Sequence, residues 1–336
     1  QITFNYYDDI VRKIFATEDG GCILIHDLLG WPLYNVKLTR IDSNGNIVEG
    51  WDNVLISQEG EKGYYEDAVE TDLGIYIIWR DSDGNLFSKH VPFESSNPSN
   101  IDVLTISVSG QLYSNSISID YSQDLNEILS CWQEQVGSVY NIHCISRDLD
   151  DLETDLDVII IHEDPLNSQK NPSVKSTLHS TYLVSWEDER TGNSSDLYIQ
   201  EINSSGDVLL DEANGVVFCD ASFNQFNSQL EAIDNQNEVY LTFWEDDRSS
   251  GKEFVTNIFV QKFSLYACTS AIGDMNDDGY YNVLDIVTLA NCVLSQNCSE
   301  INNGCAGDIN DDNTWNILDI VTLANCVLAE NCGDWS

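Results

Sequence analysis

Two stretches in the last quarter of the chain carry oxygen-bearing side chains at regular spacing. Residues 274–285 read DMNDDGYYNVLD, and residues 308–319 read DINDDNTWNILD. Both place Asp or Asn at positions 1, 3, 5, 9 and 12, the pattern by which a twelve-residue loop surrounds Ca²⁺ with hard oxygen ligands. Position 6 needs left-handed backbone, which Gly279 adopts freely and Asn313 tolerates. We therefore expect two calcium ions as cofactors.

The ligands follow from the loop positions, with a backbone carbonyl at position 7 and direct or water-mediated binding at position 9. For the first ion we expect Asp274, Asn276, Asp278, the Tyr280 carbonyl, Asn282 and Asp285. For the second we expect Asp308, Asn310, Asp312, the Thr314 carbonyl, Asn316 and Asp319. Residues 268–336 contain eleven acidic side chains and no Lys or Arg. Because these carboxylates repel one another, we expect this segment to need calcium in order to fold.

Each loop runs into the same sequence, LDIVTLANCVL, at 284–294 and at 318–328. We expect one helix there after each loop. Duplicated Asp-Asn-Asp loops that each lead into one such helix resemble the dockerin domain, and the resemblance covers residues 267–336. It implies a small α-helical calcium domain that docks to a protein. The cysteines are unusual for that family, and Ile-Val-Thr stands where many dockerins present a Ser-Thr type pair. The partners considered are therefore a cohesin-like domain and further copies of this chain.

The preceding 266 residues contain an internal repeat. Apolar segments end in a shared anchor, at Trp79, Trp132, Trp186 and Trp244, and CILIH places His26 at the corresponding position. The anchors are 53, 53, 54 and 58 residues apart. Each is followed by two further strand-like segments and preceded by one, with Asn, Asp, Gly and Ser between them. Four short strands per repeat are typical of a β-propeller blade.

We therefore expect a mainly β fold, a five-bladed β-propeller over residues 1–266, followed by the dockerin-like domain over 267–336. The fifth repeat stops before its outermost strand, and ITFN at residues 2–5 has the length and pattern to supply it. Closing the ring in this way would remove an open sheet edge. A pair of open β-sandwiches is the alternative architecture. The segments WEDERTG and WEDDRSSG resemble the tryptophan–acid–arginine repeats of secreted bacterial propeller proteins, which indicates an architecture and not an activity.

Charge and cysteines restrict the setting in which the protein works. The formal charge of −43 excludes nucleic acid and anionic lipid as partners and attracts cations. Six of the ten cysteines lie within residues 268–332, which predicts disulfides in an oxidising compartment. The sequence contains no run of about 18 apolar residues, so we expect no membrane span. We expect a secreted protein, extracellular or at a cell surface.

The positions of the cysteines suggest particular disulfides. A Gly137–Ser138 turn would place Cys131 opposite Cys144, as a disulfide or as two buried thiols. In the C-terminal repeats we expect the pairs Cys292–Cys298, Cys326–Cys332 and Cys268–Cys305, although six cysteines allow fifteen connectivities. Cys22 and Cys219 have no obvious partners. Sequons for N-glycosylation occur at Asn193, Asn203 and Asn297.

A search for catalytic residues gives only weak candidates. Enzymes built on five-bladed propellers carry carboxylates on the innermost strands, which here are Glu66, Asp67, Asp120 and Glu231. Glycoside hydrolysis needs two such groups about 5–10 Å apart. The histidines show neither catalytic-triad nor metal-ligand spacing, and we interpret the repeated tryptophans as core residues. We therefore favour a protein without enzymatic activity.

Two functional hypotheses follow. The first is an extracellular interaction or assembly protein whose calcium-dependent module attaches the propeller to a partner or to copies of itself, as a filament or surface structure. The alternative is a secreted carbohydrate-binding protein or glycosidase that the dockerin delivers to a complex, with a glycan as second partner. A close carboxylate pair on the inner strands would favour the alternative.

Overall fold

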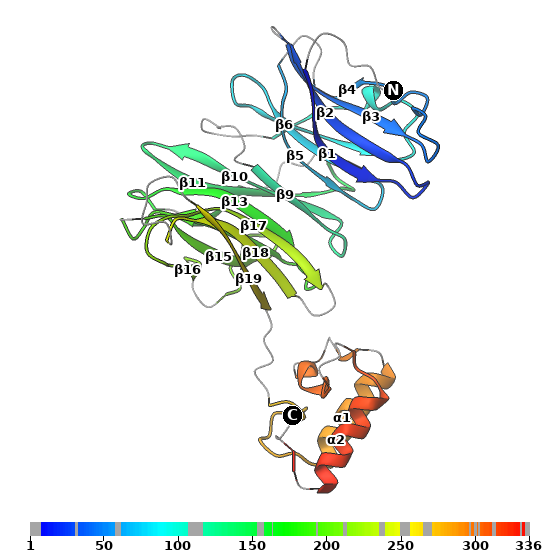
Figure 1. The fold of residues 1–336 in the computed structure, drawn as a ribbon, viewed down its shortest axis with the longest axis vertical. Helices are drawn as coiled ribbons and strands as arrows, with labels where there is room; N and C mark the ends of the chain where they lie inside the picture. The colour runs from blue at the N-terminus through cyan, green and yellow to red at the C-terminus, as the bar shows by residue number, and fades with distance from the viewer. Residues whose placement is uncertain are drawn as a thin grey trace. The chain divides into compact units, whose positions relative to one another are not determined.

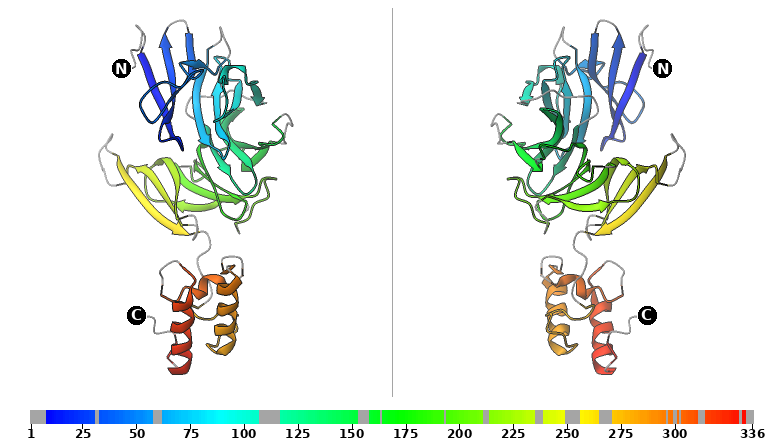
Figure 2. Two further views of the ribbon diagram at one scale, coloured as in Figure 1. Left: turned by 90° about the vertical axis from the view of Figure 1, so that its right-hand side faces the viewer. Right: turned by 90° about the vertical axis from the view of Figure 1, so that its left-hand side faces the viewer.

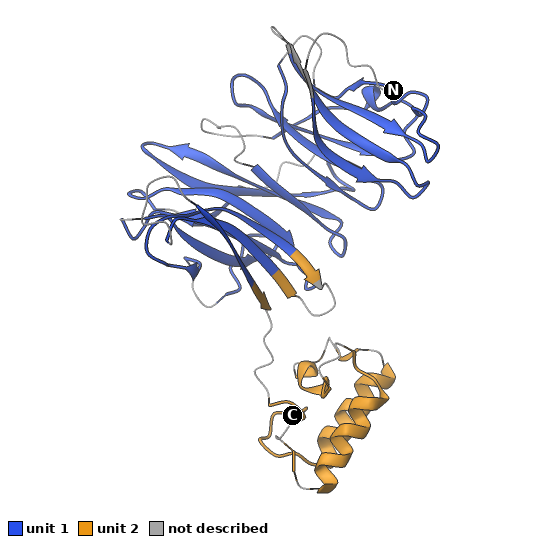
Figure 3. Cartoon of the chain, viewed as in Figure 1, with its two compact units in different colours: residues 1–231, 241–261 blue, residues 232–240, 262–336 orange. Residues whose placement is uncertain are grey.

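The computed structural model describes residues 8–30, 33–57, 62–106, 117–152, 158–162, 164–192, 194–210, 214–234, 239–248, 256–264, 271–295, 297–298, 301, 303–310, 314–329 and 331–332. The chain divides into two compact units (Figure 3). The first comprises residues 1–231 and 241–261, and the second residues 232–240 and 262–336. The boundary at residues 266/267 remains a prediction.

Five antiparallel sheets follow one another in chain order (Figures 1 and 2). The first contains β1 (Asp8–Ala16), β2 (Cys22–Gly30), β3 (Leu33–Ile41) and β4 (Val54–Leu55). The second contains β5 (Tyr64–Glu70), β6 (Gly74–Arg80), β7 (Leu86–Pro92) and β8 (Leu104–Ile106). The third contains β9 (Ile117–Ser122), β10 (Glu127–Val136), β11 (Val139–Asp148) and β12 (Ile159–His162). The fourth contains β13 (Gln169–Ser176), β14 (Tyr182–Asp188), β15 (Asp196–Ile202) and β16 (Val216–Cys219), and the fifth β17 (Gln225–Asp234), β18 (Val239–Asp246) and β19 (Asn257–Ser264).

The anchored segments found in the sequence are the second strands of these sheets. All four repeated tryptophans are at most 4% exposed, and His26 is 2% exposed. Apolar clusters fill the space between the first and second, second and third, and third and fourth sheets. The tryptophans therefore belong to the core, as expected, and do not form an exposed stacking platform.

A closed five-bladed propeller is not shown. Each sheet is open, with four strands in the first four sheets and three in the fifth as far as the structure describes them. The segment ITFN, which was expected to complete the fifth sheet, lies outside the described residues. The mainly β fold of five repeated sheets is confirmed, and ring closure stays a prediction.

Side chains on the first strand of one sheet bond to the backbone of the first strand of the next. Asp67 Oδ2 accepts from Ile119 N (3.1 Å), Ser118 Oγ from Val174 N (3.1 Å), and Ser173 Oγ from Leu230 N (3.0 Å). In the first sheet the corresponding residue is Lys13, and its Nζ donates to the Ala68 carbonyl instead. The repeat thus fixes how successive sheets pack.

The tryptophan–acid–arginine repeat forms a small buried network. Trp186 Nε1 and the guanidinium of Arg190 both donate to the buried Asp188, and the guanidinium stacks on Tyr198 at 3.9 Å from the ring centre. The same network recurs around Asp246, which accepts from Trp244 Nε1 (3.1 Å) and Arg248 Nε (2.7 Å). Each buried carboxylate is thereby neutralised and hydrogen-bonded, as a buried charge must be.

The second unit contains α1 (Val283–Ser295), the short 3₁₀ helix η3 (Gly304–Gly307) and α2 (Ile317–Ala329). Leu289 and Leu323, the equivalent residues of the two helices, are fully buried in its core. The predicted disulfides Cys131–Cys144, Cys292–Cys298 and Cys326–Cys332 are present. Cys305 is disulfide-bonded, and Cys268, its expected partner, lies outside the described residues. Cys22 and Cys219 are free thiols.

We predict that Asp246→Ala lowers the free energy of unfolding by about 2–4 kcal/mol, because it leaves a buried Trp N–H and guanidinium without their acceptor. Burial opposes the charged form of Asp246, but hydrogen bonds from Arg248 and Trp244 outweigh it and hold its pKa below the usual value. A carboxylate with a lowered pKa stabilises the fold above the ordinary Asp pKa, and this stability is lost as pH falls through the folded-state pKa.

Denaturant unfolding at pH 7 and pH 3 measures both effects. Wild type and Asp246→Ala should differ at pH 7 and converge in acid. Asp220→Ala, which removes an exposed carboxylate just after β16, should change stability by less than about 0.5 kcal/mol. Equal stability of the two variants at pH 7 would contradict the role of the network.

Candidate functional site

The first predicted calcium loop folds around its own carboxylates. Asp274 Oδ1 accepts a hydrogen bond from Asp278 N (3.2 Å), and its Oδ2 accepts one from Gly279 N (2.9 Å). Asp278 Oδ1 accepts from Tyr280 N (2.9 Å). Gly279 has φ = +79°, the left-handed backbone expected at position 6. Local spacing alone therefore places the carboxylates on the inside of the turn.

Asp285, at position 12, connects the two ends of this loop. It lies in the first turn of α1, where the helix dipole favours an acid, and it is fully buried. Its Oδ1 accepts from Met275 N (3.0 Å) and its Oδ2 from Asn282 N (2.8 Å). Position 12 thus fixes the start of the helix against the start of the loop.

The second loop repeats this arrangement. Asp319 is fully buried at the start of α2. Its Oδ1 accepts from Ile309 N (3.0 Å) and its Oδ2 from Asn316 N (2.9 Å). Asp308, Asn310, Thr314, Asn316 and Asp319 are described, whereas Asp312 lies outside the described residues.

The donor set of both loops suits a hard cation. It consists of carboxylate, amide and backbone carbonyl oxygens, and residues 268–336 contain no Lys or Arg to neutralise the buried acids. Asn276 Nδ2 donates to Asp278 Oδ2 (3.0 Å) and Asn282 Nδ2 to the Tyr280 carbonyl (3.3 Å), so both amides contact oxygens assigned to the ion. No group of three or more His, Cys, Asp or Glu side chains among the described residues converges into a metal cluster. The fit to calcium therefore rests on the donor chemistry and on the oriented carboxylates.

The two helices also expose matching apolar side chains. On α1 these are Leu284 (59% exposed), Val287 (49%) and Leu294 (83%), and on α2 Leu318 (58%), Val321 (49%) and Leu328 (83%). Residues at this spacing share one helix face. Ile286 and Ile320 instead pack against the core of the unit. Each helix thus presents an apolar stripe on the side away from that core.

The four carboxylates predicted on the inner strands all have basic partners. Glu66 binds Arg80 Nε (2.6 Å), and Asp67 binds Lys13 Nζ (3.0 Å). Lys175 Nζ lies 3.4 Å from Asp120 Oδ1 and 3.8 Å from Glu231 Oε2. These two carboxylate oxygens are therefore at most about 7 Å apart, below the upper limit of the separation that glycoside hydrolases use. Asp120 is buried and Glu231 is exposed.

The sequence analysis missed a second set of polar residues, which lie on the first and second strands of the fourth and fifth sheets. In the fourth sheet Glu187 Oε1 accepts from Asn171 Nδ2 and from Asn227 N of the fifth sheet, both at 2.7 Å. Asn227 Nδ2 also donates to Glu245 Oε1 (2.9 Å). Burial raises the pKa of Glu187. The signal was available, since Glu187 and Glu245 directly follow repeated tryptophans.

Residues 272–329 match the family described as the dockerin type I domain. This segment is a dockerin type I domain. Dockerin domains bind calcium and dock to a protein partner, usually a cohesin, and they are typically extracellular. The number of ions bound here stays a prediction. No helix among the described residues is long and apolar enough to cross a membrane. No curated protein sequence matches the chain.

Solved structures resemble the chain weakly. A protein of unknown function from Dyadobacter fermentans is 10% identical, with 76% of this chain and 82% of that chain covered and a TM-score of 0.46. An endo-arabinase from Bacteroides thetaiotaomicron is 11% identical, with 77% and 94% covered and a TM-score of 0.38. An α-L-arabinofuranosidase from Podospora anserina is 11% identical, with 77% and 90% covered and a TM-score of 0.37.

These similarities correct one expectation. The sequence favoured a protein without enzymatic activity, and this expectation is contradicted, since the similar solved structures include arabinofuranosidases and an endo-arabinase. The resemblance concerns the fold and assigns neither substrate nor catalytic residues. The filament and structural roles have no support.

We predict that Asp285→Ala weakens calcium binding at the first loop by more than about 100-fold, because outer partners of a metal ligand already contribute 10–100-fold. Isothermal titration of the full chain should show two ions for wild type and one tight ion for the variant. Asp277→Asn changes position 4, which supplies no ligand, and should retain both. Loss of binding in Asp277→Asn, or two tight ions in Asp285→Ala, would contradict the ligand assignment.

Proposed function

We propose that this is a secreted protein in which a dockerin domain loaded with two calcium ions docks the β-rich part to a protein partner. The observation that carries the proposal is the duplicated loop, in which buried acids at position 12 accept the same backbone hydrogen bonds and the domain has no basic side chain. Calcium supplies the missing positive charge and so links the fold of the domain to the ion. We place the boundary of the dockerin part at residues 266/267.

The partner is a cohesin-like domain with a complementary apolar face. Each helix carries an exposed apolar stripe, and the two stripes occupy equivalent positions after the two calcium loops. They consist of Leu284, Val287 and Leu294 on α1 and of Leu318, Val321 and Leu328 on α2. Contiguous exposed apolar surface on a small domain is typical of an interaction site. A second copy of this chain fits less well, because both copies are strongly acidic.

We predict that Leu284→Glu combined with Leu318→Glu abolishes cohesin binding and leaves calcium stoichiometry unchanged. Biosensor measurements against a panel of cohesin domains, in calcium and in chelator, test this. Wild type should bind only in calcium. Leu209→Glu, which alters an equally exposed apolar residue of the β-rich part, serves as the control.

Light scattering in the same two conditions separates the alternatives. If the chain forms oligomers only in calcium and binds no cohesin, the docking partner is a second copy of this chain and not a cohesin-like domain. The proposed docking surface would be wrong if the chain stays monomeric in calcium and binds no cohesin. It would also be wrong if the double variant binds cohesin as well as wild type does.

The second candidate function, which concerns the β-rich part, is that it acts on a carbohydrate. The observation that favours it is that Asp120 of β9 and Glu231 of β17 both approach Lys175 of β13, the first strand of the sheet between theirs. One carboxylate is buried and the other exposed, the kind of difference in environment that separates an acid from a base in glycoside hydrolysis. Asp120 Oδ2 accepts from Ser176 N (2.7 Å) and from Ser176 Oγ (2.8 Å), which holds the carboxylate in place for the base or nucleophile role.

We predict that the full chain releases reducing sugar from a panel of polysaccharides that includes arabinan. Asp120→Asn and Glu231→Gln should each lower the rate by at least about 100-fold, the size of a general acid–base contribution. Glu70→Gln, at an exposed position of the inner strand β5, should leave the rate unchanged. Unchanged rates in the two site variants, or no release from any polysaccharide, would contradict a hydrolytic role for this pair.

A further inference from the structure

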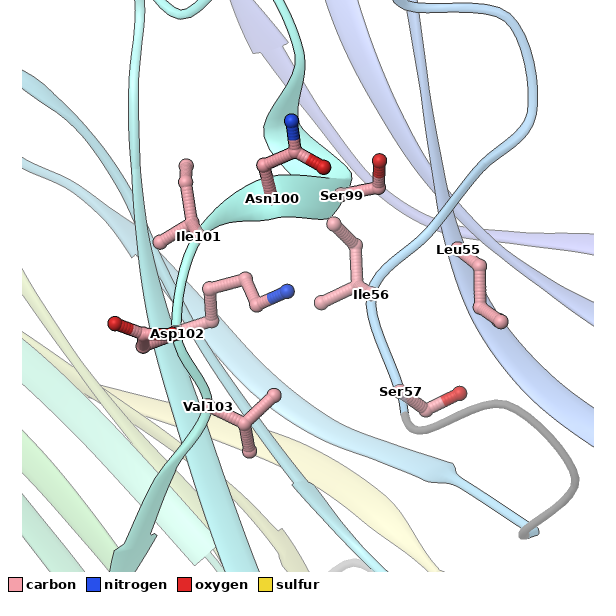
Figure 4. Close-up of a pocket in the computed structure, with 9 residues that line it drawn as sticks. Leu55, Ile56, Ser57, Ser99, Asn100, Ile101, Asp102 and Val103 are labelled. Atoms are coloured by element: carbon pink, nitrogen blue, oxygen red, sulfur yellow. The ribbon is translucent and has the colours of Figure 1, made fainter.

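A cavity of about 630 Å³ lies beside the outer strands of the first two sheets. Leu55, Ile56 and Ser57, at the end of β4, form one side of it (Figure 4). The segment Ser99–Val103, which includes the end of the short helix η1 (Pro98–Asn100), forms the other. Lys89 of β7 completes the lining. The walls thus combine apolar side chains with hydroxyl and amide groups and one amine.

Lys89 is an unusual residue for this position. It is 2% exposed and stands in the row between Phe87 and Val91, which face the apolar core between the two sheets. Among the described residues, no acceptor hydrogen-bonds to its Nζ and no carboxylate lies within ion-pair distance of it. Enclosing an amine in a largely apolar environment disfavours its charged form. Accordingly, burial lowers the pKa of Lys89, and the charge of Asp102 offsets this only in part.

The internal repeat shows what normally occupies this position. Lys89 pairs with the residue two before the anchor Trp79, and the same register holds for Thr39 in the first sheet and Gln200 in the fourth. Thr39 Oγ1 accepts from Asn53 N (3.2 Å), and Gln200 Oε1 accepts from Leu210 N (3.1 Å). In those sheets an acceptor therefore binds the connection that leads to the fourth strand.

A lysine cannot accept that backbone hydrogen bond, because an ammonium group has only donors. The cavity lies beside this connection in the second sheet, at Ser99–Val103. The third sheet carries Ile145 in the same register. The position is thus occupied by Thr, Gln or Ile in the first, fourth and third sheets, and a lysine there fills neither the acceptor role of Thr and Gln nor the apolar role of Ile.

We propose that the cavity binds a small carboxylate with a short apolar chain, whose carboxylate pairs with Lys89 Nζ. Leu55, Ile56, Ile101 and Val103 supply the apolar wall for the chain. Asp102 is exposed, and its carboxylate points away from Ile56 and the cavity (Figure 4), so it offsets the charge of the amine only in part. This site is independent of the docking and carbohydrate functions proposed above.

Hexanoate and hexylammonium test the proposal, because they share one apolar chain and carry opposite charges. Titration of the full chain, followed by NMR of the ligand or by calorimetry, should show binding of hexanoate and at least tenfold weaker binding of hexylammonium. Lys89→Met should weaken hexanoate binding at least tenfold. Lys262→Met removes one exposed positive charge elsewhere and should have no effect.

The pH dependence gives a second readout. A lysine with a lowered pKa loses its charge at a lower pH than an ordinary lysine does. As the pH is raised, hexanoate affinity should therefore begin to fall before the pH reaches the ordinary lysine pKa of about 10.4. Lys89→Met is expected to fold, because Met is similar in length and its neighbours are apolar. Equal binding of the two ligands, unchanged hexanoate binding by Lys89→Met, or a flat pH profile would each overturn the proposal.

Discussion

The structure depends on one constraint, which is that a buried carboxylate needs partners. The chain has 57 acidic and only 14 basic residues, so most acids cannot have a basic neighbour. In the sheets, Asp188, Asp246 and Asp120 are each held by tryptophan or backbone N–H groups together with a single Arg or Lys. At these positions a basic residue stands where a carboxylate enters the core. The repeated motif is a means of burying acid at low cost.

The C-terminal unit meets the same constraint in a different way. Asp285 and Asp319 are fully buried, yet no basic side chain exists in residues 268–336. Backbone N–H groups orient these carboxylates, but they bring no compensating unit charge. The proposed calcium ions would supply it, because calcium suits oxygen ligands from a flexible loop. On this proposal, folding of the domain and its ability to dock depend on the same ions.

Lys89 is a largely buried amine with no ion pair among the described residues. In the proposed site, the carboxylate of a ligand in the neighbouring cavity pairs with this amine. The sequence offered Asp120 and Glu231 among four candidate carboxylates but could not give their separation, because they belong to different sheets. Glycoside hydrolysis depends on that separation.

The sequence by itself determined everything that depends on short-range spacing. The calcium loops, the helices that follow them and the disulfides within hairpins and helix ends all join residues that are close along the chain, so spacing fixes their geometry. The repeat of an anchored strand likewise predicted five sheets, because each sheet is built from neighbouring segments. Only the tertiary structure decided that Asp120 meets Glu231 over Lys175, that Glu187 is held by Asn227 of the next sheet, and that Lys89 is buried beside a cavity. These contacts arise where separate sheets pack face to face, and the packing depends on the shape and volume of many side chains together rather than on any local pattern.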